Sequence, residues 1–476
     1  MLSALSAVKV LSVPISRSLP LPVLTTVTNF KKLTLADLIL NRRGTITFKV
    51  ILAVFGIALR FFFRRIETVN AHVVPRGVGV IFVLNHPNGL IDPALVFVAL
   101  PRKISFLAKS TLFRMPVISF LLRTVEALPL YRRIDAGEDV SKNQKTFEMC
   151  RELLARGGSI ALFPEGISHN SPKLLPMKTG AARIALGAAA SDENPVEVKI
   201  VPVGLYYTSK TTFRSEALLH FGAPFIVPSI EMDADGQPPK AAVKELTEKI
   251  EEELREVTLN AETESELHVA RIAEQIFASA AAENPNLGEK LDFLKNYVGD
   301  RKDTELTVRL RNYDERLDEF GIAPEHLSLA ELTQGFVVYR ALLQTWILIV
   351  LLPLSIFGAI LHAPAYQLCK LVAYLFSRHD ADDVASTVKV LAGMLFVPLT
   401  WLITAIILYF LSGWQLALAS IPFSFICGYI ALYSLEEFSE MHGWAKAIWL
   451  FLTRKEKFLR FYVERRELRD ALREFD

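Results

Sequence analysis

Two long stretches of the chain contain no Asp, Glu, Lys or Arg, and they restrict its fold more than any other feature. They cover residues 341–369 and 390–435, which are 29 and 46 residues long. A helix needs about 20 apolar residues to cross the hydrocarbon core of a bilayer. Of the 476 residues, 51% are hydrophobic, and the mean hydropathy is +0.31. The sequence therefore predicts an integral membrane protein.

The membrane region is expected to cover residues 336–435. Pro353 and the apolar residues 365–376 leave room for a broken or re-entrant fourth segment. A basic helical tail, 436–476, follows, and the positive-inside rule places such a tail on the cytosolic side. An odd number of spans would put residues 72–228 on the opposite side, so the topology stays open. At least three spans are expected, at about 342–362, 390–411 and 414–433.

The N-terminal segment, residues 1–71, is also basic. Its first 66 residues carry ten Lys and Arg but one acid, Asp37, which suits an anionic membrane surface. The apolar stretch 46–63 predicts a membrane-associated helix, either a marginal span or a helix lying in the interface. Residues 1–36 have the composition of an organelle targeting segment, and also of a disordered start.

Charge and cysteine content exclude several classes of protein. The chain has 53 Lys and Arg against 51 Asp and Glu, a net charge of +2, so no general basic excess predicts a nucleic-acid partner. The three cysteines, Cys150, Cys369 and Cys427, are too widely spaced for a disulfide framework or a zinc site. No metal is therefore predicted.

Between residues 72 and 228, short apolar runs alternate with helical stretches. The runs are β-rich, about five to seven residues long, and bounded by Gly, Pro or charge. Strands alternating with helices predict an α/β domain with a central sheet flanked by helices. Strands are expected at 78–84, 104–108, 127–131, 159–163 and 200–206, and helices at 93–100, 140–155 and 180–190. The charged residues 229–335 predict a solvated helical connector or cap, with no chemistry of its own.

The first of the predicted strands leads directly into Asn85-His86-Pro87-Asn88-Gly89-Leu90-Ile91-Asp92-Pro93. Asp92 followed by Pro93 predicts a helix N-cap. On one ideal helix His86 and Asp92 would point about 120° apart, so they meet only if the Asn-Gly turn folds the chain back. If they meet, the carboxylate can orient the imidazole as a general base. Otherwise they are an ordinary cap and a turn histidine.

Two further segments carry groups suited to anions. The strand end Phe163-Pro164-Glu165-Gly166 is followed by Lys173, Lys178 and a helix start at Gly180, a combination that suits a phosphate. Arg132 and Arg133 end another strand, and guanidinium groups suit bidentate phosphate binding. Taken singly, each segment is equally compatible with a capped turn or solvated arginines.

Together these segments resemble the lysophospholipid acyltransferase superfamily over about residues 80–228. NHPNGLIDP resembles the first family block, ALPLYR the second, FPEGIS with LLPMKTG the third and VPVG the fourth. The resemblance implies that His86 is the general base and that Asp92 orients it. It also implies that Arg132 binds phosphate, that Glu165 and Gly166 shape the acceptor site, and that Pro202 belongs to the acyl-donor pocket. To these we add Arg133, Lys173 and Lys178, on charge and position.

The chain departs from the usual superfamily motifs at two places, and these departures indicate one subgroup. Five residues instead of four separate His86 from Asp92, and Ile167-Ser168 replaces the Thr-Arg of the usual third block. Both departures occur in the fungal-type glycerol-3-phosphate or dihydroxyacetone-phosphate acyltransferases, which also share a stretch like Phe213-Arg214-Ser215. The resemblance thus implies acyl transfer from acyl-CoA to glycerol-3-phosphate, with no cofactor. Transfer to lysophosphatidate is the alternative.

The sequence disfavours two other classes of protein, a transporter and a non-catalytic membrane scaffold. A transporter is disfavoured because residues 341–369 and 390–435 hold one ionisable side chain of the kind that marks ion paths, His362. A non-catalytic membrane scaffold is disfavoured because the expected site residues are present. The expected location is a membrane with the catalytic domain facing the cytosol: the endoplasmic reticulum in a eukaryote, or the plasma membrane in a bacterium.

Overall fold

The computed structural model describes residues 30–32, 46–100, 102–114, 116–132, 138–190, 197–210, 212–278, 286–299, 304–327, 335–377 and 382–473. Apart from residues 30–32, the predicted targeting segment lies outside these ranges. Arg133 lies outside them as well.

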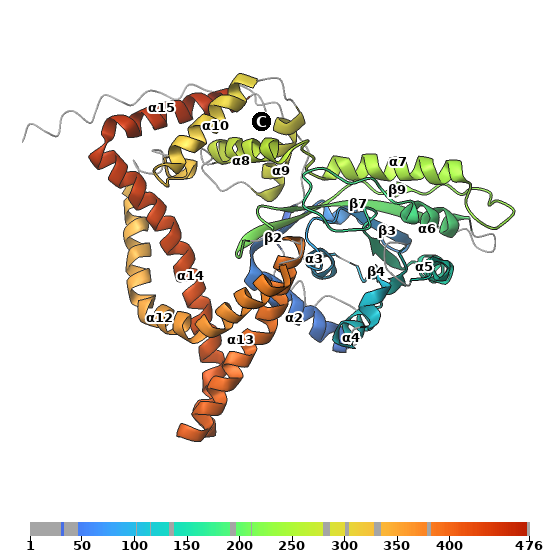
Figure 1. Ribbon diagram of the computed structural model, residues 1–476, viewed down its shortest axis with the longest axis horizontal. Helices are drawn as coiled ribbons and strands as arrows, with labels where there is room; N and C mark the ends of the chain where they lie inside the picture. The colour runs from blue at the N-terminus through green and yellow to red at the C-terminus, as the bar shows by residue number, and fades with distance from the viewer. Residues whose placement is uncertain are drawn as a thin grey trace, which may run out of the picture.

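A nine-stranded mixed sheet forms the centre of the domain (Figure 1). Its path runs β1-β2-β8-β7-β3-β6-β4-β5, and β9 pairs with β7. The central strand β3 is parallel to both neighbours, β6 and β7, so their carboxyl ends share one edge. The strands are β1 Phe30–Lys32, β2 Phe63–Val69, β3 Gly79–Leu84, β4 Ser105–Lys109, β5 Leu128–Leu130, β6 Ser159–Leu162, β7 Val198–Tyr207, β8 Ser215–Phe221 and β9 Phe225–Ile226.

Helices cover both faces of the sheet. Along β3, Val80, Phe82 and Leu84 belong to the core shared with α2 (Ile46–Phe62) and α3 (Ile91–Ala99). The alternate residues, Ile81 and Val83, face the core shared with α5, α6 and α7, as the two-residue period of a strand requires. This confirms the predicted α/β class. The helices of the second face are α5 Asn143–Ala155, α6 Gly180–Ala189 and α7 Lys240–Val257.

The predicted helix at 46–63 is α2, and it belongs to the domain core. Phe48, Leu52 and Leu59 are buried, whereas Ile46 and Val50 are exposed. The chain passes directly from α2 into β2, which was not predicted because Arg64 and Arg65 give it the appearance of a charged flank. Both arginines pair with Glu216 of β8 at 3.1 Å. The two charged side chains are therefore compatible with a strand, because a residue of the neighbouring strand pairs with both.

The connector, residues 229–335, was predicted to be solvated helix, but part of it forms a hydrophobic core. Its helices α8 (Glu264–Ala278), α9 (Leu287–Gly299) and α10 (Thr304–Asp318) share a second hydrophobic core with α15 (Lys455–Leu472). Tyr313 of α10 and Phe458 of α15 are both fully buried there. The C-terminal tail is thus packed against the connector.

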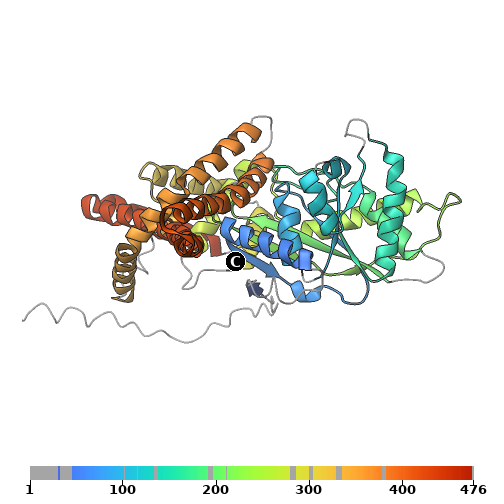
Figure 2. The same ribbon diagram turned by 90° about the horizontal axis from the view of Figure 1, so that it is seen from below.

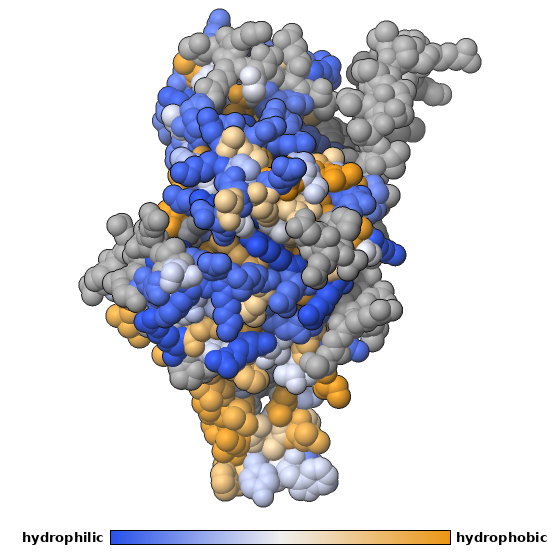
Figure 3. Space-filling view, turned by 90° about the vertical axis from the view of Figure 1, so that its right-hand side faces the viewer, coloured by the Kyte–Doolittle hydropathy of each residue, from blue (hydrophilic) through white to orange (hydrophobic). Residues whose placement is uncertain are grey.

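Three long apolar helices form the membrane region: α12 (Gly335–Ser377), α13 (Asp382–Ser412) and α14 (Trp414–Thr453). All three are long and apolar enough to cross a membrane by length and composition, in agreement with the three apolar segments expected there. The predicted fourth segment is not a separate helix in the part of this region that the structure describes, because α12 continues through Pro353 and Pro364. Hydrophobic residues cover most of the narrow lower part of the molecule above a paler tip (Figure 3), where α13 and α14 extend downward in Figure 1.

Candidate active site

The loop after β3 brings His86 and Asp92 together. His86 Nδ1 lies 2.9 Å from Asp92 Oδ2, and the carboxylate is fully buried. The chain folds back at Gly89, which has φ 43°, and the Asn88 amide donates to Asp92 Oδ2 at 2.7 Å. Asp92 is not the predicted N-cap: Leu90 holds that position. The carboxylate of Asp92 turns back toward the loop because three donors meet it there.

The third donor is Tyr207, at the end of β7. Its hydroxyl donates to Asp92 Oδ1 at 2.5 Å. Burial raises the pKa of Tyr207 well above its usual value, and the Asp92 charge and this hydrogen bond raise it further. Tyr207 therefore stays a neutral donor. The sequence held no motif that could have identified it, because the contact joins residues 115 positions apart.

Glu165 holds the backbone of the His86 loop. Its buried carboxylate accepts hydrogen bonds from the amides of His86, at 2.8 Å, and Leu175, at 2.9 Å, and it pairs with His169 Nε2. The His169 amide donates to the His86 carbonyl at 3.2 Å. The His86 ring also stacks on Phe163, with ring centroids 4.1 Å apart. The imidazole is thus fixed by its backbone, its Nδ1 and one face of its ring.

A cavity of about 1070 Å³ opens beside His86. Its walls are mostly apolar and come from α2, α3, α13 and α4 (Pro116–Thr124). Polar groups are confined to a few positions. Besides His86, these include Lys109, Arg132, Glu165, Ser168 and Lys178. The cavity therefore offers an apolar volume next to an imidazole and a small set of cations.

Most of the predicted site residues meet at this cavity. Arg132 Nη1 donates to the Gly166 carbonyl at 2.8 Å. The Lys178 amide donates to the Pro164 carbonyl at 2.7 Å, and its side chain passes over Gly166, whose φ is 79°. A Cβ at Gly166 would stand 3.4 Å from Lys178 Cγ. That distance is an ordinary van der Waals contact, so the positive φ, and not lack of space, favours glycine at this turn.

Two predicted residues lie elsewhere. Lys173 Nζ pairs with Glu262 at 2.8 Å, so its charge is met by the segment before α8, and it does not line the cavity. Pro202 lies in β7 with its ring toward Gly222, where a Cβ would stand 2.7 Å from Pro202 Cγ. It is not among the residues that line the cavity. The predicted roles of Lys173 in phosphate binding and of Pro202 in the acyl-donor pocket are not supported by these positions.

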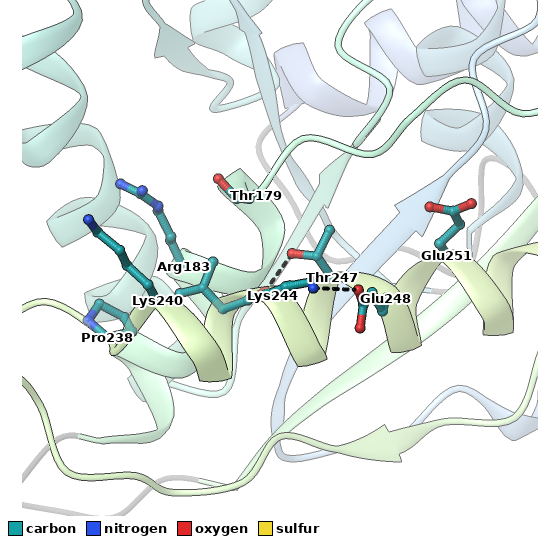
Figure 4. Close-up of a pocket in the computed structure, with 9 residues that line it drawn as sticks. Thr179, Arg183, Pro238, Lys240, Lys244, Thr247, Glu248 and Glu251 are labelled. Atoms are coloured by element: carbon teal, nitrogen blue, oxygen red, sulfur yellow. Dashed lines mark hydrogen bonds and ion pairs between the residues drawn. The ribbon is translucent and has the colours of Figure 1, made fainter.

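A second, smaller cavity of about 340 Å³ lies between α6 and α7 (Figure 4). Arg183 and Lys240 reach toward the same side of it, and Lys244 pairs with Glu248 at 3.6 Å. None of the predicted site residues lines this cavity. Within the described ranges, no group of three His, Cys, Asp or Glu side chains could hold a metal ion.

The segment that carries most of the site is similar to known proteins. Residues 65–206 match the family model described as Acyltransferase. The chain is 27% identical to glycerol-3-phosphate O-acyltransferase 2 of Saccharomyces cerevisiae over 57% of its length and 39% of the relative's. It is 30% identical to glycerol-3-phosphate O-acyltransferase 1 of the same yeast, over 54% of its length and 36% of the relative's.

A chloroplastic 1-acyl-sn-glycerol-3-phosphate acyltransferase of Brassica napus is 30% identical over 30% of this chain and 37% of the relative. The chain spans less than two fifths of the length of the yeast proteins it matches. Residues 65–206 of this chain are therefore similar to the acyltransferase family.

Proposed function

We propose that this chain is a membrane-bound O-acyltransferase that transfers a fatty acyl group from acyl-CoA to glycerol-3-phosphate. The observation that carries the proposal is the His86–Asp92 pair at 2.9 Å beside a large apolar cavity. The apolar walls suit a fatty chain, whose burial is favourable by about 0.8 kcal/mol per CH₂ group. Arg132 and Lys178 on the same cavity suit a phosphate.

The proposed reaction needs one proton carrier. His86 Nε2 accepts the proton of the acceptor hydroxyl while the hydroxyl oxygen attacks the thioester carbonyl carbon. The carbonyl π electrons move onto its oxygen and return when the C–S bond breaks. The leaving sulfur then takes the proton from the His86 imidazolium. An ester and a free thiol result, and His86 is restored.

Asp92 and Tyr207 would support this proton transfer without touching the substrate. The carboxylate accepts from Nδ1–H, which leaves the Nε2 lone pair free for the incoming proton. It also stabilises the imidazolium that forms. Tyr207 and the Asn88 amide hold the carboxylate in this orientation. Because the thioester is already activated, positioning and charge stabilisation account for the chemistry, and no cofactor is required.

Two resemblances favour glycerol-3-phosphate over lysophosphatidate as the acceptor. The motif departures at His86–Asp92 and Ile167-Ser168 are those of the fungal-type enzymes, and both yeast relatives are named for glycerol-3-phosphate. The Brassica relative, named for 1-acylglycerol-3-phosphate, supports the second candidate over a shorter segment. Dihydroxyacetone phosphate has the same phosphate and a similar hydroxyl, so it is a further possible acceptor.

Purified protein tested with three acceptors in parallel separates these candidates. With one long-chain acyl-CoA, we expect thiol release to be at least about tenfold faster with glycerol-3-phosphate or dihydroxyacetone phosphate than with lysophosphatidate, since discrimination among similar substrates spans about 10–200-fold. Release is followed by thiol-reactive dye. Activity with lysophosphatidate alone would contradict the proposed acceptor while leaving acyl transfer intact.

We further propose that the catalytic domain, the connector and the C-terminus lie on the cytosolic side. The end of α14 contacts the connector, where Lys446 Nζ reaches the Gly321 carbonyl at 3.4 Å, and α15 packs on α8 and α10. The first turns of α13 lie on the catalytic domain, because Val390 joins its core. The hairpin of α13 and α14 therefore leaves and returns on one side, which requires two crossings.

By the same argument α12 does not cross completely. It begins after the connector and ends five residues before α13, and so both of its ends lie on the catalytic side. Its middle packs against the hairpin, where Trp401 Nε1 donates to His362 Nε2 at 2.8 Å. Pro353 and Pro364 fall within this helix, and proline bends helices. We propose that α12 is re-entrant, in the endoplasmic reticulum of a eukaryote or the plasma membrane of a bacterium.

Cysteine labelling in sealed vesicles tests this topology. In a cysteine-free background, Asn312→Cys and Arg466→Cys should react with an impermeant maleimide from the same side. Ser412→Cys, at the hairpin tip, should react only from the opposite side or after lysis. Labelling of positions 312 and 466 from opposite sides would contradict two crossings.

A further inference from the structure

The cavity beside His86 extends beyond the segment that matches the acyltransferase family. Residues 65–206 supply its polar end. Part of its apolar wall comes from α2, where Ile51, Phe55 and Leu59 recur every four residues along one face. Another part comes from α13, through Val390 and Leu391. A membrane helix more than 180 residues beyond the matched domain thus contributes to the site.

The helix α2 leads away from the catalytic pair. Its last residue, Phe62, precedes Phe63, whose ring stacks on Tyr207 at 5.6 Å between centroids, and Tyr207 holds Asp92. Leu59 is therefore near the reacting end, and Ile51 is about 12 Å farther along the axis at 1.5 Å per residue. An acyl chain that starts at His86 would run along this face of α2.

A charged contact ties the membrane hairpin to the catalytic domain at the end of α2. Arg214 Nη2 donates to Glu436 of α14 at 3.2 Å, and its Nε pairs with the other carboxylate oxygen. Arg214 Nη1 donates to the Arg60 carbonyl at 3.2 Å, and the Arg214 amide to the Phe62 carbonyl at 2.7 Å. One side chain therefore joins α2, the start of β8 and α14.

Two features make this contact specific. Arg214 has φ 66°, a left-handed conformation that is uncommon for a residue other than glycine. Its side chain and that of Glu436 are only 20% and 26% exposed, so their fork-shaped contact is partly shielded from water. Phe61 adds an edge contact with Phe425 of α14, at 5.5 Å between centroids. Figure 2 shows blue α2 next to the orange membrane helices.

We propose that the C-terminal membrane hairpin is part of the acyl-binding site. Leu391 of α13 limits the chain length that the cavity accepts, and the Arg214–Glu436 pair is the positioning contact that holds the hairpin against α2. This inference rests on the proposed acyl transfer. Arg214 and Glu436 act through α13 and do not touch the substrate, so their loss should change acyl-CoA selectivity more than the chemical step.

A bulky substitution at Leu391 tests the wall directly. Leu391 lines the cavity and is 41% exposed, so it is not part of a fully packed core and a tryptophan can be accommodated. With acyl-CoA of 8 to 18 carbons, Leu391→Trp should lower kcat/KM for the 18-carbon chain by about tenfold or more relative to the 10-carbon chain. The matched control is Leu402→Trp, on the same helix, 53% exposed and not a cavity residue. It should keep the wild-type profile.

Charge reversal tests the positioning contact. Arg214→Glu and Glu436→Arg should each raise the KM for long-chain acyl-CoA several-fold with a smaller change in kcat, and the double variant should recover most of the loss. Reversal of Arg309 and Glu467, an exposed pair between α10 and α15 at 3.2 Å, should leave the profile unchanged. If a reversed single variant fails to fold, Glu436→Gln provides the same KM comparison.

The outcomes distinguish this inference from the proposed function. An active wild type whose chain-length profile is the same in Leu391→Trp would overturn the role of α13. An active double variant with no recovery over its parents would overturn the role of the ion pair. A folded wild type that releases thiol from no acyl-CoA in the presence of glycerol-3-phosphate would instead overturn the acyl transfer on which both rest.

Discussion

Replacing His86 with alanine should lower the rate of thiol release from acyl-CoA by about 10²–10⁴-fold, with the protein still folded in membranes. This is the usual contribution of general-base catalysis. Of the described histidines, His169 is the one beside His86, and its Nε2 is engaged by Glu165. Alanine keeps the loop backbone, since Glu165 and His169 contact only main-chain atoms of residue 86.

The control for this variant is His268→Ala. His268 pairs with Asp314 at 3.4 Å on the connector, with its side chain 63% exposed, so its loss should leave the rate within about twofold. Thermal unfolding in detergent shows whether each variant is folded. A folded His86→Ala protein with undiminished turnover would exclude His86 as the base.

The second large effect is expected for Asp92→Asn, with a loss of about 10²–10⁴-fold in kcat. Three donors converge on the carboxylate: His86 Nδ1, the Asn88 amide and the Tyr207 hydroxyl. An asparagine amide group must place its NH₂ against at least one of them. If that one is Nδ1, the imidazole takes the tautomer with its proton on Nε2 and cannot accept from the substrate. The buried site also loses the charge that stabilises the imidazolium.

Tyr207→Phe separates the effect of losing a hydrogen bond to Asp92 from the effect of losing the Asp92 charge. It removes one donor and leaves the Asp92 charge, so we expect a loss of about tenfold, as for a hydrogen bond to a charged group worth about 1.5–3 kcal/mol. Steady-state kcat and KM across pH 5–9 provide the comparison. An Asp92→Asn protein within twofold of wild type would show that the carboxylate only holds the loop in place and has no part in proton transfer.

The sequence predicted the local parts of this site well. The strand that leads to His86, the Asn-Gly turn and the turn at Gly166 are each determined by residues close in sequence. The structure contains all three. The meeting of His86 with Asp92 remained one of two alternatives, because it depends on how sharply the turn folds back. The structure selects the alternative in which the two side chains meet.

Contacts between residues far apart in the chain could not be predicted from the sequence. Tyr207 contacts Asp92 from a distant part of the chain. The cavity walls formed by α2 and α13 also come from parts of the chain well separated from His86, and no local sequence pattern predicts such contacts. Asp92 was misassigned as an N-cap because Asp-Pro has the composition of one, whereas its donors come from the turn and from β7. The contact of Lys173 with Glu262, 89 positions away, was likewise not predictable from neighbouring residues.

Product analysis tests the central claim most directly. Purified protein is given one equivalent of long-chain acyl-CoA and excess glycerol-3-phosphate, and the lipid product and free thiol are both quantified, the first by mass spectrometry. We predict one acylglycerol-3-phosphate for each thiol released, and at least about a hundredfold less of both products from His86→Ala in the same time. Thiol released without an acylated phosphate product, or equal product from the His86→Ala protein, would contradict it.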